Sequence, residues 1–75
     1  MSDAEHIDFA VRGEYIQLDQ LLKAAALVGS GGAAHAAAEA GMVSVDGRPE
    51  TRKRAKLRPG QVVSFDRYRI RLVSA

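Results

Sequence analysis

The sequence predicts an α+β fold in which two packed helices lie against a small, mostly antiparallel sheet. Two observations lead to this fold class. Apolar residues alternate with other residues in four short stretches, as in half-buried strands: residues 6–11, 42–45, 63–65 and 68–73. Residues 18–28 and 33–40 instead have the spacing or the composition of helices.

The first strand is expected over residues 6–11, with Ile7, Phe9 and Val11 on one face. The first helix follows and is expected to end at Gly29. Its apolar residues recur along one side of the helix: Leu18, Leu21, Leu22, Ala25 and Val28.

The second helix is expected over residues 33–40, which are almost entirely alanine, the strongest helix former. Ser30 is a favoured N-cap residue, and Gly41 stands where a glycine commonly ends a helix. Because alanine side chains are small, we expect the two helices to approach closely and to form a tight pair.

Two glycine turns shape the second half of the chain. Asp46-Gly47 is a preferred pair for a two-residue hairpin turn, in which both residues have positive φ. Pro49 cannot donate to a sheet, so the returning strand is expected to be short or to lie at an edge. Arg58-Pro59-Gly60 has the order of a type II turn and leads into the last two strands.

The size of the chain limits it to one domain. We expect this domain to span residues 1–75, with a core over about residues 6–73 and a flexible segment at residues 1–5. The sequence has no cysteine, and no apolar run approaches the roughly 20 residues of a membrane span. Its acidic start lacks the basic-then-apolar order of a signal peptide, so we expect a cytoplasmic protein. We also expect a monomer.

The two parts of the chain carry opposite charge. Residues 1–47 contain seven acids and two bases, a net charge of −5, whereas residues 48–75 contain nine bases and two acids, a net charge of +7. Six of the eleven Lys and Arg residues stand between Arg48 and Arg58. Such a surface attracts polyanions, although a merely solvated basic surface explains the composition equally well.

The main candidate binding residues are cations that follow the Asp46-Gly47 turn: Arg48, Arg52, Lys53, Arg54 and Lys56. Lysine and arginine bind phosphates, and each contact releases counterions. Most of the aromatic residues fall on the apolar side of strands, so we expect no platform on which bases could stack. The predicted partner is therefore structured RNA, recognised through its shape and backbone.

A second candidate contact is the start of the second helix, at Ser30, Gly31 and Gly32. The glycines leave the first N–H groups of the helix bare, so these groups could reach a phosphate. The simpler interpretation, which the sequence favours, is that Ser30 only caps the helix.

Enzymatic activity has little support in the sequence. His6 and His35 are the two histidines, they stand in different elements, and no acids are paired at a spacing that suggests acid–base catalysis. Neither a nucleophile elbow nor a phosphate-binding loop motif occurs. We expect a binding module without catalytic residues, cofactors or metal sites.

Several segments together resemble the S4 RNA-binding domain, a family named for a ribosomal protein. They are Leu18-Asp19-Gln20-Leu21-Leu22-Lys23, Ser30 with Ala34, Gly41-x-Val43-x-Val45-Asp46-Gly47 and Leu57-x-Pro59-Gly60-x-Val62. The run Glu50-Thr51-Arg52-Lys53-Arg54-x-Lys56 is similar to that of the small stand-alone bacterial members. The resemblance covers about residues 6–73.

The resemblance implies an S4-like fold with its αL motif, and a surface that docks on structured RNA, commonly ribosomal or transfer RNA. The partner would then be the ribosome or a ribosomal assembly intermediate. The expected contacts come from the basic run, from the start of the second helix and from Lys23. Many members carry arginine after the serine and a basic residue four further on, where this chain has Gly31 and His35. With these two basic residues absent, RNA binding is expected to depend more on residues 52–56.

Two other functions fit parts of the sequence. A DNA-binding helix-turn-helix over residues 18–40 needs polar side chains on its second helix, which offers mainly alanine and His35. A carrier protein of the β-grasp fold has similar turns at Asp46-Gly47 and Pro59-Gly60. Such carriers react through a C-terminal Gly-Gly, and this chain ends in Val73-Ser74-Ala75.

Overall fold

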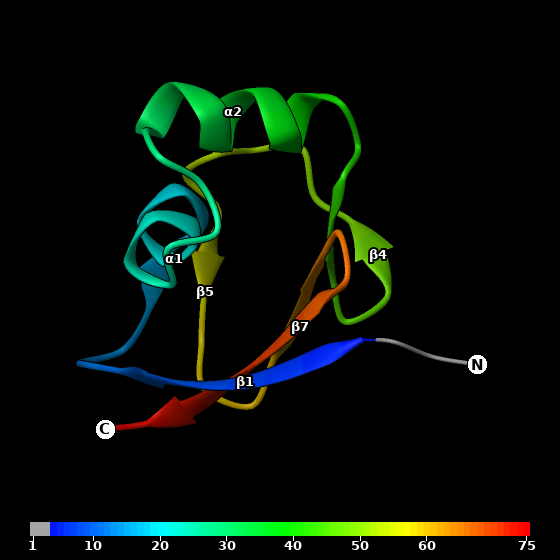
Figure 1. Cartoon of the computed structure of the whole chain (residues 1–75). Helices are drawn as coiled ribbons and strands as arrows, with labels where there is room; N and C mark the ends of the chain where they lie inside the picture. The colour runs from blue at the N-terminus through cyan, green and yellow to red at the C-terminus, as the bar shows by residue number, and fades with distance from the viewer. Residues whose placement is uncertain (1–3) are drawn as a thin grey trace.

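The computed structural model describes residues 4–75 and places two helices on one face of a five-stranded sheet (Figure 1). This arrangement confirms the predicted α+β fold class. The elements, in chain order, are β1 (Glu5–Val11), β2 (Ile16–Gln17), α1 (Leu18–Ala24), α2 (Gly31–Glu39), β3 (Val43–Val45), β4 (Arg48–Pro49), β5 (Lys56–Leu57), β6 (Val62–Phe65) and β7 (Tyr68–Ser74).

The main sheet has the strand order β1-β7-β6-β3-β4 and is mixed. Strands β3, β4, β6 and β7 pair in an antiparallel manner, as the sequence predicts. The pair β1–β7 is parallel, with Glu5 opposite Tyr68 and Val11 opposite Ser74. These strands lie at the two ends of the described chain. A parallel pair requires a long crossover connection, and here residues 12–67 form it.

The N-terminal segment was expected to be flexible over residues 1–5. Glu5 is the first residue of β1, and its N–H donates to the carbonyl oxygen of Arg67 at 2.8 Å. Residues 1–3 lie outside the described part of the chain.

A second, two-stranded sheet joins β2 to β5, with Ile16 opposite Leu57 and Gln17 opposite Lys56. Neither strand was predicted from the sequence. Each is only two residues long, so neither has enough alternating positions to reveal a strand period.

Helix α1 is shorter than predicted. It ends at Ala24, and Ala26 has a φ of 61°, which no right-handed helix allows. The N–H groups of Leu27 and Val28 turn back to the carbonyl oxygen of Leu22, at 3.0 and 3.4 Å. Leu27 and Val28 still pack against the core, and their apolar spacing therefore imitates a longer helix.

Helix α2 begins at Gly31, two residues earlier than predicted. The Ser30 hydroxyl oxygen accepts a hydrogen bond from the N–H of Ala33 at 3.1 Å, which confirms Ser30 as the N-cap. Gly41 has a φ of 74° just after the helix, as expected of a C-terminal glycine. Within residues 4–75, neither helix has the length and apolar character needed to cross a membrane.

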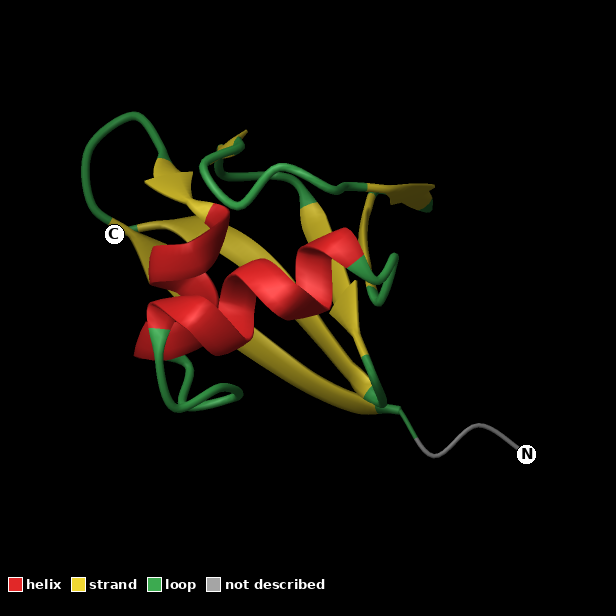
Figure 2. Cartoon of the chain, turned by 90° about the horizontal axis from the view of Figure 1, so that it is seen from above, coloured by secondary structure: helices red, strands yellow, loops and turns green. Residues whose placement is uncertain are grey.

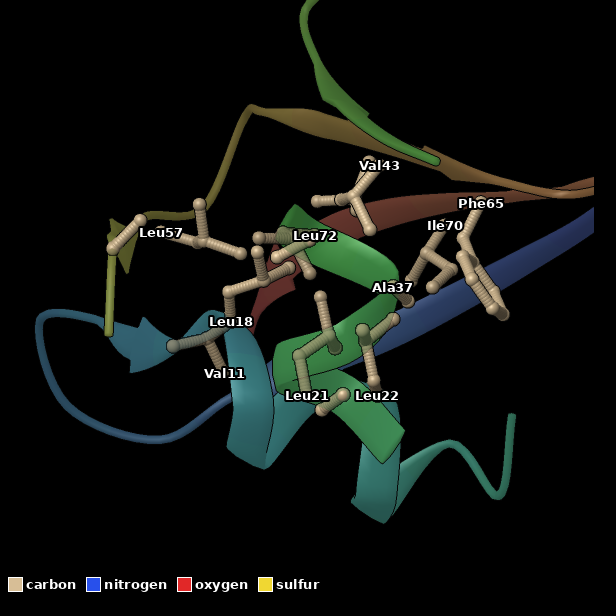
Figure 3. Packing of buried hydrophobic residues seen from close by; sticks show 14 residues of the cluster. Val11, Leu18, Leu21, Leu22, Ala37, Val43, Leu57, Phe65, Ile70 and Leu72 are labelled. Atoms are coloured by element: carbon tan, nitrogen blue, oxygen red, sulfur yellow. The ribbon is translucent and has the colours of Figure 1, made fainter. Parts of the chain in front are cut away.

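The core lies between the two helices and the sheet. Leu18, Leu21 and Leu22 of α1 are buried, and three alanines of α2 pack in the same cluster, which confirms the close helix pair. Figure 3 shows the side chains of α1, α2 and the strands gathered in this cluster. The buried residues are Val11, Leu18, Leu21, Leu22, Ala34, Ala37, Ala38, Val43, Ala55, Leu57, Val63, Phe65, Ile70 and Leu72.

The predicted turns are also present. Asp46 and Gly47 have φ values of 51° and 83°, and they join β3 to β4. Strand β4 contains only two residues and lies at the edge of the sheet, as Pro49 led us to expect. Gly60 has a φ of 97°, and the N–H of Gln61 donates to the carbonyl oxygen of Arg58 at 3.2 Å, as in a type II turn.

Candidate nucleic-acid interface

The cations predicted to bind RNA lie mainly on residues 50–56, which we call the basic loop. This loop connects β4 to β5 and runs below α2 in Figure 1. Its first residue, Glu50, donates its N–H to the carbonyl oxygen of Val43 at 2.9 Å, and its last residue, Lys56, lies in β5 opposite Gln17. Both ends of the basic loop are therefore attached to strands.

The middle of the basic loop is attached to the start of α1. The N–H of Leu18 donates to the carbonyl oxygen of Ala55 at 3.0 Å, and the N–H of Asp19 donates to that of Lys53 at 2.8 Å. Gln17, the N-cap residue of α1, makes no side-chain capping bond. Because the first N–H groups of a helix have no partner within the helix, the loop carbonyls take over this role. The helix in turn fixes the loop backbone.

Arg52 is held by Glu50 within the basic loop. Its Nε and one terminal nitrogen lie 3.1 and 3.3 Å from the two carboxylate oxygens, and its backbone N–H donates to Glu50 Oε2 at 3.0 Å. The hydrogen bond from the Arg52 side chain is the main reason that the pKa of Glu50 lies below its ordinary value. Arg52 remains exposed, but its charge is partly neutralised.

The other cations of the basic loop have no such partner. Within residues 4–75, no carboxylate lies within 4.0 Å of the side-chain nitrogens of Lys53, Arg54 or Lys56. Lys56 instead places its Nζ 5.0 Å from the centre of the Tyr15 ring, a cation–π contact. Arg54 and Lys56 are exposed, and Lys53 is half-buried.

Two other arginines are paired with carboxylates. Arg71, on the face of the sheet opposite the helices, makes two hydrogen bonds to Asp8, at 2.9 and 3.1 Å, and Arg67, in the turn between β6 and β7, donates to Glu5 at 2.8 Å. The bond from Arg71 is the main cause that lowers the pKa of Asp8. Within residues 4–75, eight Lys and Arg residues have no carboxylate partner, and five of these lie between Arg48 and Arg58. Unpaired positive charge is thus concentrated in and next to the basic loop.

The other predicted contacts form a separate group. Ser30, Gly31 and Gly32 begin α2, and Lys23 lies in the last turn of α1, at the opposite end of that helix from the basic loop. A helix of seven residues is about 10 Å long. In Figure 2 the loop that joins the helices and the basic loop lie on opposite sides of the helix pair. The structure therefore separates the predicted residues into two groups.

The start of α2 keeps its first N–H groups available. The Ser30 hydroxyl caps only Ala33, and within residues 4–75 no acceptor bonds to the N–H of Gly31 or Gly32. A Cβ added to Gly31 would meet no atom within 4 Å, so this end of the helix is also open. Free N–H groups at a helix N-terminus are suited to bind an anion.

Comparison with known proteins identifies the family of the chain. A family model described as the S4 domain matches residues 9–73. The chain belongs to the S4 domain family. YbcJ of Escherichia coli (strain K12), named as a candidate RNA-binding protein, is 42% identical over 60 residues, which cover 80% of this chain and 86% of YbcJ. YbcJ of Shigella flexneri is similar to the same extent.

The structure supports the same relationship. The solution structure of E. coli YbcJ, described as containing an αL motif involved in RNA binding, matches with a TM-score of 0.64 and 36% identity. The match covers 99% of this chain and 92% of the YbcJ chain. This S4 domain thus has the same fold as YbcJ.

The two ring nitrogens of His35 in this S4 domain have different surroundings. Its Nε2 lies 3.1 Å from Glu39 Oε1, one turn further along α2. Its Nδ1 is buried, and within residues 4–75 it has no hydrogen-bond partner. The Glu39 carboxylate is thus the partner of the Nε2 atom of His35.

Two contacts that shape the basic surface of this S4 domain were not predicted from the sequence. The first is the ion pair of Glu50 with Arg52, for which their separation by two residues is a local signal. The second is the contact of Tyr15 with Lys56, which exists only because β2 pairs with β5. Within residues 4–75, no three His, Cys, Asp or Glu residues gather as a metal site would require.

Proposed function

We propose that this S4 domain is a non-catalytic module that binds structured RNA of the ribosomal or transfer RNA class. The observation that carries the proposal is the concentration of unpaired cations around a basic loop whose backbone is held by α1 and by two strands. A fixed backbone reduces the entropy lost when several phosphates are bound at once. The descriptions of YbcJ as an RNA-binding protein support the same function.

Two groups of contacts define the proposed interface. Lys53, Arg54 and Lys56 bind phosphates directly, and Arg48 extends this group on β4. Arg52 contributes less to RNA binding, because Glu50 competes with the RNA for its guanidinium group. At the other end of α1, the N–H groups of Gly31 and Gly32 and the side chain of Lys23 bind a second part of the RNA backbone. The partner is the ribosome or an assembly intermediate, bound by a cytoplasmic monomer.

The exposed side of α2 argues against DNA recognition by a helix-turn-helix. Its exposed residues include Gly32, Ala33 and Ala36, which carry no hydrogen-bonding side chain. A recognition helix reads base edges with polar side chains in the major groove. Helix α2 is therefore suited to lie against a backbone and not to read a base sequence.

The test is the salt dependence of binding to a ribosomal RNA hairpin, compared with a DNA duplex of equal length. The affinity for RNA is expected to fall linearly with the logarithm of the salt concentration. Arg54→Ala should reduce the slope by about 1, because one phosphate contact is lost. Arg69→Ala, which removes an exposed and unpaired arginine from β7, is the matched control and should leave the slope unchanged.

Two results would contradict the proposal. One is affinity for the hairpin that does not depend on salt. The other is an equal loss of slope in Arg54→Ala and Arg69→Ala, because this would mean that the net charge alone attracts RNA. Stronger binding to the DNA duplex would instead favour the helix-turn-helix function.

A further inference from the structure

An exposed aromatic side chain lies next to the basic loop. Tyr15 is 39% exposed, which makes it one of two large apolar side chains exposed within residues 4–75, together with Met42. It stands directly before β2, and the pairing of β2 with β5 brings it to the end of the basic loop. There it contacts the ammonium group of Lys56.

Tyr15 also forms part of the wall of a pocket. The pocket has a volume of about 290 Å³ and is lined by Phe9, Ala10, Arg12, Tyr15, Ile16 and Gln20. Phe9 and Ile16 are half-buried and pack against the core, so this part of the wall is firmly supported. Lys56 contacts the Tyr15 ring but does not line the pocket.

The lining of the pocket combines an apolar surface with two polar groups. Phe9, Ile16 and the Tyr15 ring offer an apolar wall on which a flat ring can pack. Arg12 is exposed, and within residues 4–75 it has no carboxylate partner, so it is available to bind a phosphate. The side chain of Gln20 has both donors and an acceptor, which suit the edge of a base.

The volume of the pocket limits its occupant to a small group. Pockets for drug-sized ligands begin at about 300 Å³, so this pocket is at the lower limit. A pocket of this size can hold a single nucleobase. Lys56 and Arg12, close to the pocket, favour a ring that is attached to phosphates.

The geometry points to a subsite for one unpaired nucleobase, which stacks on Tyr15 while the neighbouring phosphates contact Lys56 and Arg12. This inference rests on the proposed RNA-binding function and refines it. A base that is fully paired in a helix cannot reach the pocket, whereas a bulged or terminal base can be turned out of the stack. The S4 domain would therefore prefer RNA helices that carry a bulge beside the contacted backbone.

The experiment compares two RNA hairpins that differ only in a single bulged 2-aminopurine, a fluorescent base. The wild-type protein is expected to bind the bulged hairpin about 5- to 150-fold more tightly, as stacking of one base on an aromatic side chain predicts. Binding should also change the fluorescence of the bulged base. Tyr15→Ala should remove both effects, whereas Tyr15→Phe, which keeps the ring, should retain them.

The ratio of the affinities for the bulged and the unbulged hairpin measures the contribution of the pocket separately from that of the basic loop. Tyr15→Ala also releases Lys56 from its ring contact, but this changes the affinity for both hairpins and cancels in the ratio. Met42→Ala removes the other exposed apolar side chain and is the control, with an unchanged ratio expected. Thermal unfolding checks that each variant is folded.

The outcomes separate the subsite from the general function. If the wild type binds both hairpins equally, or if Tyr15→Ala keeps the preference, the subsite does not exist while the RNA-binding function stands. If the wild type binds neither hairpin at low salt, the proposed function is wrong and the subsite with it.

Discussion

The backbone N–H of Asp19 donates a hydrogen bond to the carbonyl oxygen of Lys53, at 2.8 Å. This bond joins the first turn of α1 to the middle of the basic loop, 34 residues further along the chain. A loop with several neighbouring cations tends to spread because like charges repel, and this bond opposes that spread. Folding of the helix and order in the candidate RNA-binding loop are therefore coupled.

Hydrogen exchange at the two helix starts should differ. The N–H groups of Leu18 and Asp19 have acceptors in the basic loop and should exchange slowly for the first turn of a helix. Those of Gly31 and Gly32 have no acceptor within residues 4–75 and should exchange rapidly. NMR-detected exchange measures all four amides, and equal rates at the two helix starts would contradict the coupling described above. Addition of RNA should slow exchange at Gly31 and Gly32.

Substitutions at Ser30 separate capping from phosphate binding. Ser30→Ala should lower the free energy of unfolding by about 1 kcal/mol, because the bond to Ala33 is lost. Ser30→Asp should keep the stability near that of the wild type, since aspartate is an equally good cap. Calorimetry or denaturant titration measures both effects.

The Ser30→Asp variant also tests the proposed contact at the start of α2. Its carboxylate would repel a phosphate there, so RNA affinity should fall although the fold is intact. Ser74→Asp, at the exposed end of β7, introduces the same charge far from the helix and is the control. An equal effect of the two substitutions would show that no phosphate binds at α2.

Glu50→Gln should strengthen RNA binding. The substitution removes the carboxylate that pairs with Arg52 and leaves an amide oxygen that can still accept the Arg52 backbone N–H. With its guanidinium released, Arg52 can contact phosphate, and the salt slope should rise by about 1. Binding measured against salt concentration checks this result.

A matched control for Glu50→Gln exists on the back of the sheet. Asp8→Asn removes one carboxylate in the same way and releases Arg71. It should increase affinity only slightly and leave the slope unchanged. If both substitutions raise the slope equally, the basic loop has no special role in binding.

The stability of the protein should depend on the Glu50 carboxylate in mildly acidic solution. Its pKa is lowered in the folded state, mainly by the hydrogen bond from Arg52, so its contribution is fully present above about pH 4.5. This contribution is lost as the pH falls through the lower, folded-state pKa. Because Arg52 is 78% exposed, we expect at most about 1 kcal/mol, or a few degrees in Tm.

Thermal unfolding over a range of pH values tests this dependence. The Tm of Glu50→Gln should fall less on acidification than that of the wild type, because the variant has no carboxylate to protonate at this position. Asp8 also has a lowered pKa but titrates in both proteins, so it does not affect the difference. Identical pH profiles would mean that the Glu50–Arg52 pair does not stabilise the fold.

Most of the local structure could be predicted from the sequence. The alternation in β1 and β7, the capping of α2 by Ser30 and the turns at Gly47 and Gly60 depend on neighbouring residues, and all were confirmed. The predicted end of α1 was wrong, because the apolar residues Leu27 and Val28 lie in a turn after the helix and still pack against the core. A periodic pattern of apolar residues indicates which side chains are buried, and side chains beyond the end of a helix can also be buried.

The sequence by itself determined the family, the order of the elements and the location of the positive charge between Arg48 and Arg58. The tertiary structure decided which charges remain unpaired, how the basic loop is fixed to Asp19, and that the start of α2 lies at the other end of α1. It also placed Tyr15 beside Lys56, 41 residues away in the chain. These relationships arise from pairing between distant segments, such as β2 with β5, and local residue preferences carry no information about them.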